Sequence, residues 1–412
     1  MVKEVTSAHP EGRFRRFDTG RGLELGVACT GIAMIALAGA ADTAWFDRHF
    51  LPSFFTPRHQ QLAIDAILRL VVASLGLAIL LFGRSAVRRY ARTRQAREII
   101  GTAIMSAGAL FAAILTTELI MRTQTWHAAQ FHNQQEPRRV YDPGLGWVFL
   151  PGHRGQDLVA GRRIDYVMDS HGYRIAAPSG KLDFRLPTII LSGESVMAGA
   201  GLPWQEATPG QVGAHFGDQI ADIAVNGYST DQSYMRLRNE LPRFSCPVTV
   251  VTLFMTSFLE RNLNDDRPHL DRDLRWHPAR QGWRLAALAG LVVPYRSKRT
   301  IDAGVAMTSA VLRATVALAR SRGAASLIVV PSFTPESTAE RALRKRILDD
   351  AGLDYVLVPI DSHWRLTGDM HPDVHGARAI AAAISRRLEP YGLGSEVSPD
   401  KQGHNSCGSS MR

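Results

Sequence analysis

The chain has 412 residues, of which 45% are hydrophobic, and a formal net charge of +10 at pH 7. This length is enough for two or three domains with at least one large hydrophobic core. The basic charge does not indicate nucleic-acid binding, because much of it lies in two short arginine-rich stretches, 13–21 and 84–97, with no stacking aromatics interleaved.

Three apolar segments come first, at residues 23–41, 62–83 and 99–121. Each is about long enough to cross the hydrocarbon core of a bilayer, which requires roughly 20 residues. The second segment contains Asp65 and Arg69, whose spacing allows them to pair along one helix face. We therefore expect residues 1–122 to form a cytoplasmic N-terminus and a membrane anchor of three transmembrane helices.

The distribution of arginine predicts how this anchor is oriented. The N-terminus and the loop after the second segment are strongly basic, which favours the cytoplasmic side for both. The third segment then leads outward, so that everything after Arg122 lies outside the cytoplasm. In a Gram-negative cell this predicts a multi-pass protein of the inner (cytoplasmic) membrane with its main domain in the periplasm.

Residues 123–184 are rich in turn-forming residues and predict a lead-in of short strands and turns. Between residues 185 and 392, helical patterns alternate with five apolar, strand-like runs, at 188–192, 220–225, 247–254, 325–331 and 355–360. This alternation predicts an α/β domain in which a parallel sheet is covered by helices on both faces. Residues 393–412 are polar and rich in glycine and serine, and we expect them to be disordered.

The sequence predicts neither a metal nor a cofactor. Cys29, Cys246 and Cys407 show no metal-ligand spacing and no evident pairing, so we expect free thiols. The acidic stretch at 265–273 lacks the glycine and the terminal glutamate of a calcium loop.

Three side chains have a spacing that suggests catalysis. Ser195 comes directly after the first strand-like run, and Asp369 and His371 lie on one loop after the last run. The carboxyl ends of parallel strands share one edge of a sheet, so we expect these side chains to meet there. Together they would provide a nucleophile, a group that orients the base, and a general base.

These motifs resemble those of the SGNH hydrolases, also called GDSL esterases, over roughly residues 140–390. Residues 193–195 read Gly-Glu-Ser and are similar to the first block of the family, with glutamate in place of the usual aspartate. Residues 369–372 read Asp-Met-His-Pro and are similar to its last block. The resemblance implies a three-layer α/β fold with a parallel sheet, and an esterase whose catalytic residues are Ser195, Asp369 and His371.

The same resemblance points to an oxyanion site. Residues 224–232 resemble the second block, which supplies a backbone N–H, here from either Ala224 or Gly227 in addition to that of Ser195. The third block departs from the family, because Ser257 stands about where an asparagine normally donates to the oxyanion. The hydroxyl of Ser257, or the side chain of Asn226 or Asn262, could donate instead. Loss of one such donor can cost about 2.7–4 kcal/mol of transition-state stabilisation.

We therefore expect a membrane-anchored extracytoplasmic serine esterase that removes an O-acyl group from a glycan or a lipid. Two alternatives remain at this point. An O-acyltransferase with the same triad would act on a cell-surface polysaccharide, and it would need a membrane partner to supply acyl groups, because three spans are too few to carry them across. A non-catalytic SGNH-like protein that binds glycans or assists assembly is favoured by the missing asparagine.

Overall fold

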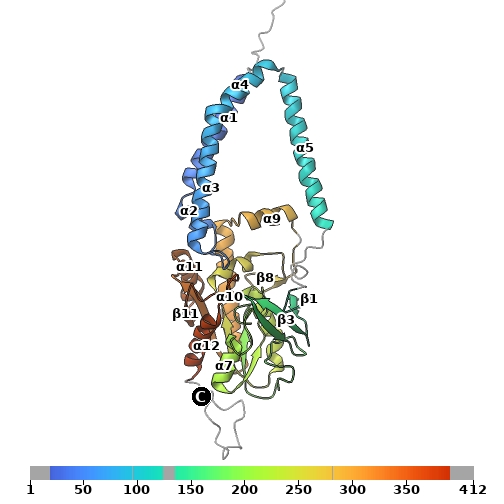
Figure 1. Cartoon of the computed structure of the whole chain (residues 1–412), viewed down its shortest axis with the longest axis vertical. Coiled ribbons are helices and arrows are strands. Elements are labelled where there is room, and N and C mark those ends of the chain that lie inside the picture. Colours follow the sequence, from blue (N-terminus) through green and yellow to red (C-terminus); the bar gives the residue numbers. More distant parts are fainter. Residues whose placement is uncertain (1–18, 95, 124–134, 281, 390–412) are drawn as a thin grey trace, which may run out of the picture. The chain divides into compact units, whose positions relative to one another are not determined.

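A computed structural model describes residues 19–94, 96–123, 135–280 and 282–389 of the chain (Figure 1). The chain forms two compact units, one made of Met1–Phe46 and Gln61–Thr117 and the other of Asp47–Gln60 and Glu118–Arg412. The predicted tail at 393–412 lies outside the described residues.

The first unit is helical. Its helices are α1 (Thr19–Ala40), α3 (Arg58–Ala78), which continues through a π-helical turn at Ile79–Gly83 into α4 (Arg84–Thr93), and α5 (Ala96–Thr123). Three stretches of them, Arg21–Ala40, Arg58–Thr93 and Arg97–Thr123, are long and apolar enough to cross a membrane. They match the three segments predicted from the sequence, except that the first ends at Ala40 and not at Ala41.

Glycine allows two of these helices to cross closely. A Cβ added to Gly31 of α1 would lie 2.8 Å from the carbonyl oxygen of Gly76 in α3. The predicted pair of Asp65 and Arg69 is present at 3.9 Å, and Arg69 also donates to the carbonyl of Ala38. Asp65 and Arg69 of α3 are thus partnered within the helical unit.

The second unit is built on a parallel sheet of five strands. They are β5 (Thr188–Ser192), β6 (Gln219–Asp222), β7 (Pro247–Leu253), β10 (Ala325–Thr334) and β11 (Tyr355–Asp361). Their order in the sheet is β6-β5-β7-β10-β11, and every neighbouring pair is parallel. From β5 the chain continues to β6 on one side, whereas from β7 it continues to β10 on the other, so the strand order reverses between β5 and β7. Open α/β sheets form their binding sites at such a point.

Helices cover both faces of this sheet, and alternate strand residues show it. Ile189 and Leu191 of β5 pack in one cluster with α7 (Thr208–Phe216) and α12 (Val374–Leu388). Ile190 between them points to the other face, where α8 (Thr230–Glu240) and α10 (Lys298–Ser321) pack. All five residues of β5 are buried, as expected for a central strand covered on both sides. The predicted three-layer α/β architecture is confirmed.

Helix α10 is also long and apolar enough to cross a membrane, but half of its most apolar stretch is buried inside the structure. Its residues Ile301, Val305 and Leu312 belong to a core cluster with Ile328 and Val330 of β10. We therefore assign α10 to the α/β domain.

The lead-in forms two antiparallel hairpins, β1 (Arg139–Asp142) with β2 (Gly146–Phe149), and β3 (Arg154–Val159) with β4 (Arg162–Val167). One cysteine prediction is wrong, because Cys246 is disulfide-bonded. Cys29 is a free thiol, as expected, and Cys407 lies outside the described residues.

Candidate active site

Ser195, His371 and Asp369 meet at the carboxyl edge of the sheet. Nε2 of His371 lies 2.8 Å from Oγ of Ser195, and Nδ1 of the same ring lies 2.5 Å from Oδ1 of Asp369. The order of groups is therefore hydroxyl, imidazole, carboxylate, as a nucleophile–base–orienter set requires. Burial opposes ionisation of Asp369, but the hydrogen bond and charge of His371 hold the pKa of its carboxyl below the usual value.

The loop that carries the acid and the base is held at several points. The N–H of Leu366 donates to the carbonyl of His371, and the guanidinium of Arg365 donates to the carbonyl of Met370. Asp373 caps the next helix by accepting from the N–H groups of His375 and Gly376. The imidazole also packs against Phe54, whose ring centroid is 5.3 Å from its own. These contacts restrict the ring to the orientation that faces Ser195.

The turn before the nucleophile requires glycine. Gly193 has φ +158°, and a Cβ there would lie 3.0 Å from the Cβ of Met197 and 3.2 Å from that of Leu253. Ser195 is followed by a series of turns, and the next helix, α7, begins only at Thr208. The backbone N–H groups at and after Ser195 therefore belong to a turn and not to the start of a helix.

A buried arginine from the lead-in fixes these turns. Arg174 donates through Nη1 to the carbonyls of Ala198 and Gly199 and through Nη2 to that of Leu202, at 2.6–2.8 Å. Its backbone also bridges to Asp222 at the end of β6. The lead-in, through Arg174, thus supports the turns that follow Ser195.

Glu194 contacts Ser195 directly, although the sequence pattern gave it no role beyond its place in the first block. The hydroxyl of Ser195 donates to its Oε2 at 2.6 Å, and the N–H of Val196 approaches the same carboxylate at 3.2 Å. Both Glu194 and Ser195 are buried. Glutamate has one methylene more than the aspartate usual in this block, and its carboxylate reaches the hydroxyl of the next residue.

Arg261 is the second residue that was missed. It lies in the 3₁₀ helix Thr256–Leu263, which follows β7 and holds the altered third block. Its Nη1 is 3.5 Å from Oε2 of Glu194, and its guanidinium lies over the ring of Phe258 at 3.8 Å. Burial lowers the pKa of Arg261 to about 10, so it remains charged at neutral pH. Only its half-buried position next to Glu194, which depends on the fold, distinguishes it from other arginines.

The predicted oxyanion residues have different surroundings. The N–H of Ala224 is engaged by Oδ1 of Asp222 at 3.2 Å, whereas that of Gly227 has no acceptor within the described part of the chain. Asn262 is structural, because its side chain bonds to Thr230 and Thr308. The side-chain oxygen of Asn226 is buried without a partner, and its carbonyl accepts from Trp147. Ser257 is half-buried, and no hydrogen bond joins its hydroxyl to the triad among the residues described.

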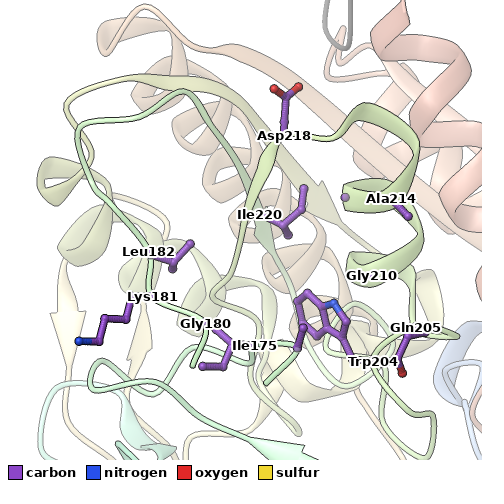
Figure 2. A pocket seen from close by; sticks show the side chains of 12 residues that line it. Ile175, Gly180, Lys181, Leu182, Trp204, Gln205, Gly210, Ala214, Asp218 and Ile220 are labelled. Atoms are coloured by element: carbon purple, nitrogen blue, oxygen red, sulfur yellow. The ribbon is translucent and has the colours of Figure 1, made fainter. Parts of the chain in front are cut away.

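Pockets and groups of metal-ligand side chains are the other features that could form a site. A surface pocket of about 450 Å³ lined by Lys181, Trp204 and Asp218 lies at the amino end of β6, whereas Ser195 follows the carboxyl end of β5 (Figure 2). Among the described residues, no group of three His, Cys, Asp or Glu side chains is arranged to hold a metal ion.

No family model matches the sequence, and no curated protein matches it. Solved structures that the fold is similar to include a member of the lipolytic protein G-D-S-L family from Veillonella parvula, with 11% identity and a TM-score of 0.30 over 49% of this chain and 97% of that one. An acetyl xylan esterase from Butyrivibrio proteoclasticus has 9% identity and a TM-score of 0.33, over 52% and 67% of the two chains. A family two carbohydrate esterase from Cellvibrio japonicus has 14% identity and a TM-score of 0.31, over 53% and 64%.

Proposed function

We propose that this chain, whose α/β domain has the fold of the SGNH hydrolases, is a membrane-anchored serine esterase. The observation that carries the proposal is the hydrogen-bonded series from Ser195 through His371 to Asp369 at the switch point of the sheet. Ester hydrolysis is the reaction that this set of groups performs with the fewest additional requirements.

The reaction proceeds in two halves. Oγ of Ser195 attacks the ester carbonyl while Nε2 of His371 takes the hydroxyl proton, and Asp369 stabilises the imidazolium that forms. The tetrahedral intermediate then collapses, and the alcohol leaves with the proton held by His371. Water, deprotonated by His371, attacks the resulting acyl-enzyme, and the carboxylic acid product departs as Ser195 recovers its proton.

The negative charge of the intermediate needs donors that are already in place. The N–H of Ser195 is one. Of the two second-block residues, Gly227 is the better second donor, because the N–H of Ala224 is occupied by the carboxylate of Asp222. A serine in place of the third-block asparagine leaves this site without its usual side-chain donor.

Membrane anchoring and an extracytoplasmic domain are part of the proposal. Three apolar helices of sufficient length and the arginine distribution of the sequence support the anchor and its orientation. The disulfide bond of Cys246 supports an oxidising compartment for the α/β domain. An O-acyl ester of a glycan or a lipid at the outer face of the membrane is the substrate class that fits this location.

The test uses the full chain in detergent micelles with p-nitrophenyl acetate, and with an acetyl donor plus an oligosaccharide acceptor. We expect hydrolysis that is lost in Ser195→Ala and retained in the matched control Ser192→Ala, another buried serine of the same strand end. Transfer to the acceptor in preference to water would instead identify an acyltransferase. An equal rate in wild type and Ser195→Ala would overturn the proposal.

A further inference from the structure

Three consecutive backbone carbonyls of the second block are each held by a different arginine. Nη1 of Arg139 donates to the carbonyl of Asn226 at 3.2 Å, and Nη1 of Arg267 donates to that of Gly227 at 2.8 Å. Nη1 of Arg261 donates to the carbonyl of Tyr228 at 3.3 Å. These arginines come from β1, from the 3₁₀ helix after β7, and from the loop before β8 (His269–Leu270). We call Arg139, Arg261 and Arg267 the arginine clamp.

The clamp determines which N–H of this loop is available. In a trans peptide unit the C=O and the next N–H point in opposite directions. The N–H of Tyr228 donates to the carbonyl of Val225, and that of Ser229 donates to Oε1 of Gln232. Of the three peptide units whose carbonyls are held, only the one between Asn226 and Gly227 keeps an N–H without an acceptor in the described ranges.

The direction of the Gly227 N–H is fixed by hydrogen bonds to the carbonyl at the other side of the same peptide unit. The carbonyl of Asn226 accepts from Arg139 and also from Nε1 of Trp147, at 3.0 Å. Gly227 has φ +83°, and a Cβ there would lie 3.4 Å from Nη1 of Arg139 and from Cζ2 of Trp147. The N–H of Val225 donates to the carbonyl of Gly193, two residues before Ser195. The loop that contains Gly227 is therefore hydrogen-bonded to the turn that contains Ser195.

The clamp also gives this loop a positive environment. Burial lowers the pKa of Arg139 and of Arg261 to about 10, which leaves both cationic at neutral pH. Arg139 has no carboxylate partner within the ranges that the structure describes, and Arg261 approaches Glu194 only at 3.5 Å. The face of Trp147 lies 5.9 Å from Arg139 and 5.4 Å from Arg267, which supports both cations away from water.

We propose that Arg139, Arg261 and Arg267 are positioning residues that hold the N–H of Gly227 toward the oxyanion of the ester intermediate. Their charge and their fixed carbonyl contacts take over the stabilisation that the missing third-block asparagine would provide. This inference rests on the proposed esterase activity. It explains how a site that lacks the third-block asparagine could still stabilise the oxyanion.

The test compares Arg139→Met and Arg267→Met with Arg139→Lys, in the full chain. The matched control is Arg322→Met, because Arg322 donates to the carbonyl of Phe244 far from the site. We expect kcat to fall about 10- to 100-fold in the two methionine variants, with KM within about twofold, because one transition-state interaction is weakened. Arg139→Lys, which keeps the charge, should recover part of the loss.

A boronic acid that forms a tetrahedral adduct with the serine provides the second readout. Its Ki should rise by the same factor as kcat/KM falls, whereas the Tm of the variants should match that of Arg322→Met. A lower Tm with unchanged kcat and Ki would show a merely structural role and overturn the inference alone. An inactive wild type would overturn the proposed function and, with it, the clamp.

A second, independent observation concerns α9 (Arg284–Val292) and the residues beside it. Residues 285–295 contain no charged side chain. Trp283, Leu288, Val293 and Tyr295 are between 40% and 53% exposed, which is unusual for large apolar residues placed so close together.

Both ends of this segment are hydrogen-bonded to other helices, one end to α5 and the other to α2 (Thr43–His49). The N–H groups of Arg284 and Leu285 donate to the carboxylate of Glu118, near the end of α5, at 3.0 Å. At the other end, the N–H of Arg296 donates to the carbonyl of His49, the last residue of α2 (Thr43–His49), and the His49 ring stacks on Tyr295. Tryptophan and tyrosine at the two ends are typical of a segment at a lipid–water interface.

We infer that residues 283–295 lie on the outer surface of the lipid bilayer; this rests on the proposed membrane anchor. The test places the photo-crosslinking residue benzoylphenylalanine at Leu288 of the full chain in phosphatidylglycerol-containing nanodiscs. Phe111 of α5, in a proposed membrane span, is the positive control for crosslinking to lipid. Leu357 of β11 is the matched negative control, because it is 39% exposed compared with 40% for Leu288.

Lipid adducts from positions 288 and 111 but not from 357 are expected. Adducts from 111 alone, or a crosslink from 288 to a second protein chain, would overturn the inference and leave the anchor standing. The absence of adducts from 111 would overturn both.

Discussion

Oγ of Ser195 lies 2.6 Å from Oε2 of Glu194, so its hydroxyl can donate to this carboxylate. Nε2 of His371, the base of the proposed triad, lies 2.8 Å from the same Oγ of Ser195. One proton cannot serve two acceptors at once, so the carboxylate competes with the imidazole for it. Attack on an ester requires the proton to lie toward His371. When the hydroxyl donates to Glu194, it must therefore turn toward His371 before the proposed attack.

We therefore predict that Glu194→Asp accelerates acylation. The shorter side chain withdraws the competing acceptor, and a hydrogen bond to a charged group is worth about 1.5–3 kcal/mol, so a rise of about tenfold in the second-order rate with a fluorophosphonate is expected. Glu260→Asp, the same change at a half-buried glutamate outside the triad, is the control and should leave the rate unchanged. A slower reaction of Glu194→Asp would show that the carboxylate assists the nucleophile.

The N–H of Gly227 is predicted to be an oxyanion donor, and Gly227→Ala tests this. Its φ of +83° and the close approach of Arg139 would force the loop to shift. We expect kcat to fall about 10- to 100-fold. Gly217→Ala, at φ +69° with open space around it, is the matched control and should lower stability but not kcat. Equal kcat values in the two variants would remove Gly227 from the site.

Asp369→Asn should abolish most activity without unfolding the domain. An amide in place of the carboxylate no longer holds Nδ1 of His371 as a hydrogen-bond donor, so the ring is held in the wrong tautomer. We expect kcat to fall by about 10³ or more, as in other triads. Hydrolysis of p-nitrophenyl acetate and the Tm of the same sample give both quantities, and a kcat within tenfold of wild type would contradict the assignment.

Asp222 should make the α/β domain less stable as the pH rises. Burial raises the pKa of its carboxyl to about 7 in the folded chain, against a usual value of 3.8. The folded state therefore favours the protonated form, and the resulting stabilisation is complete below about pH 4 and is lost as the pH rises through 7. The shift corresponds to a loss of the order of 4 kcal/mol in the free energy of unfolding.

Asp222→Asn removes this titration, and urea denaturation of wild type and variant in detergent between pH 4 and pH 8 measures it. The free energy of unfolding of the variant should change less over this range than that of wild type. Parallel pH profiles for the two proteins would show that Asp222 is not the group responsible.

The fold could be predicted from the sequence because its signals are local. Apolar runs such as 188–192 are continuous, and the helical patterns between them leave few alternatives for how the strands connect. The meeting of Ser195 with the loop of His371 followed from the rule that the carboxyl ends of parallel strands share one edge. Three apolar stretches of sufficient length were equally evident, and the structure has them as helices.

What the sequence did not reveal depends on contacts between distant residues. The approach of Arg261 to Glu194 spans 67 positions, and nothing in either local pattern indicates it. The choice between Ala224 and Gly227 depends on where the side chain of Asp222 points. The disulfide of Cys246 was missed because pairing has no local signature.

The central claim is that the hydroxyl of Ser195 is a nucleophile. Treating the full chain in detergent with a fluorophosphonate and mapping the adduct by peptide mass spectrometry tests it most directly. We predict a single modified serine, Ser195, and no modification in His371→Ala although that variant remains folded. A folded wild-type protein that remains unmodified, or an adduct on a different serine, would contradict the account.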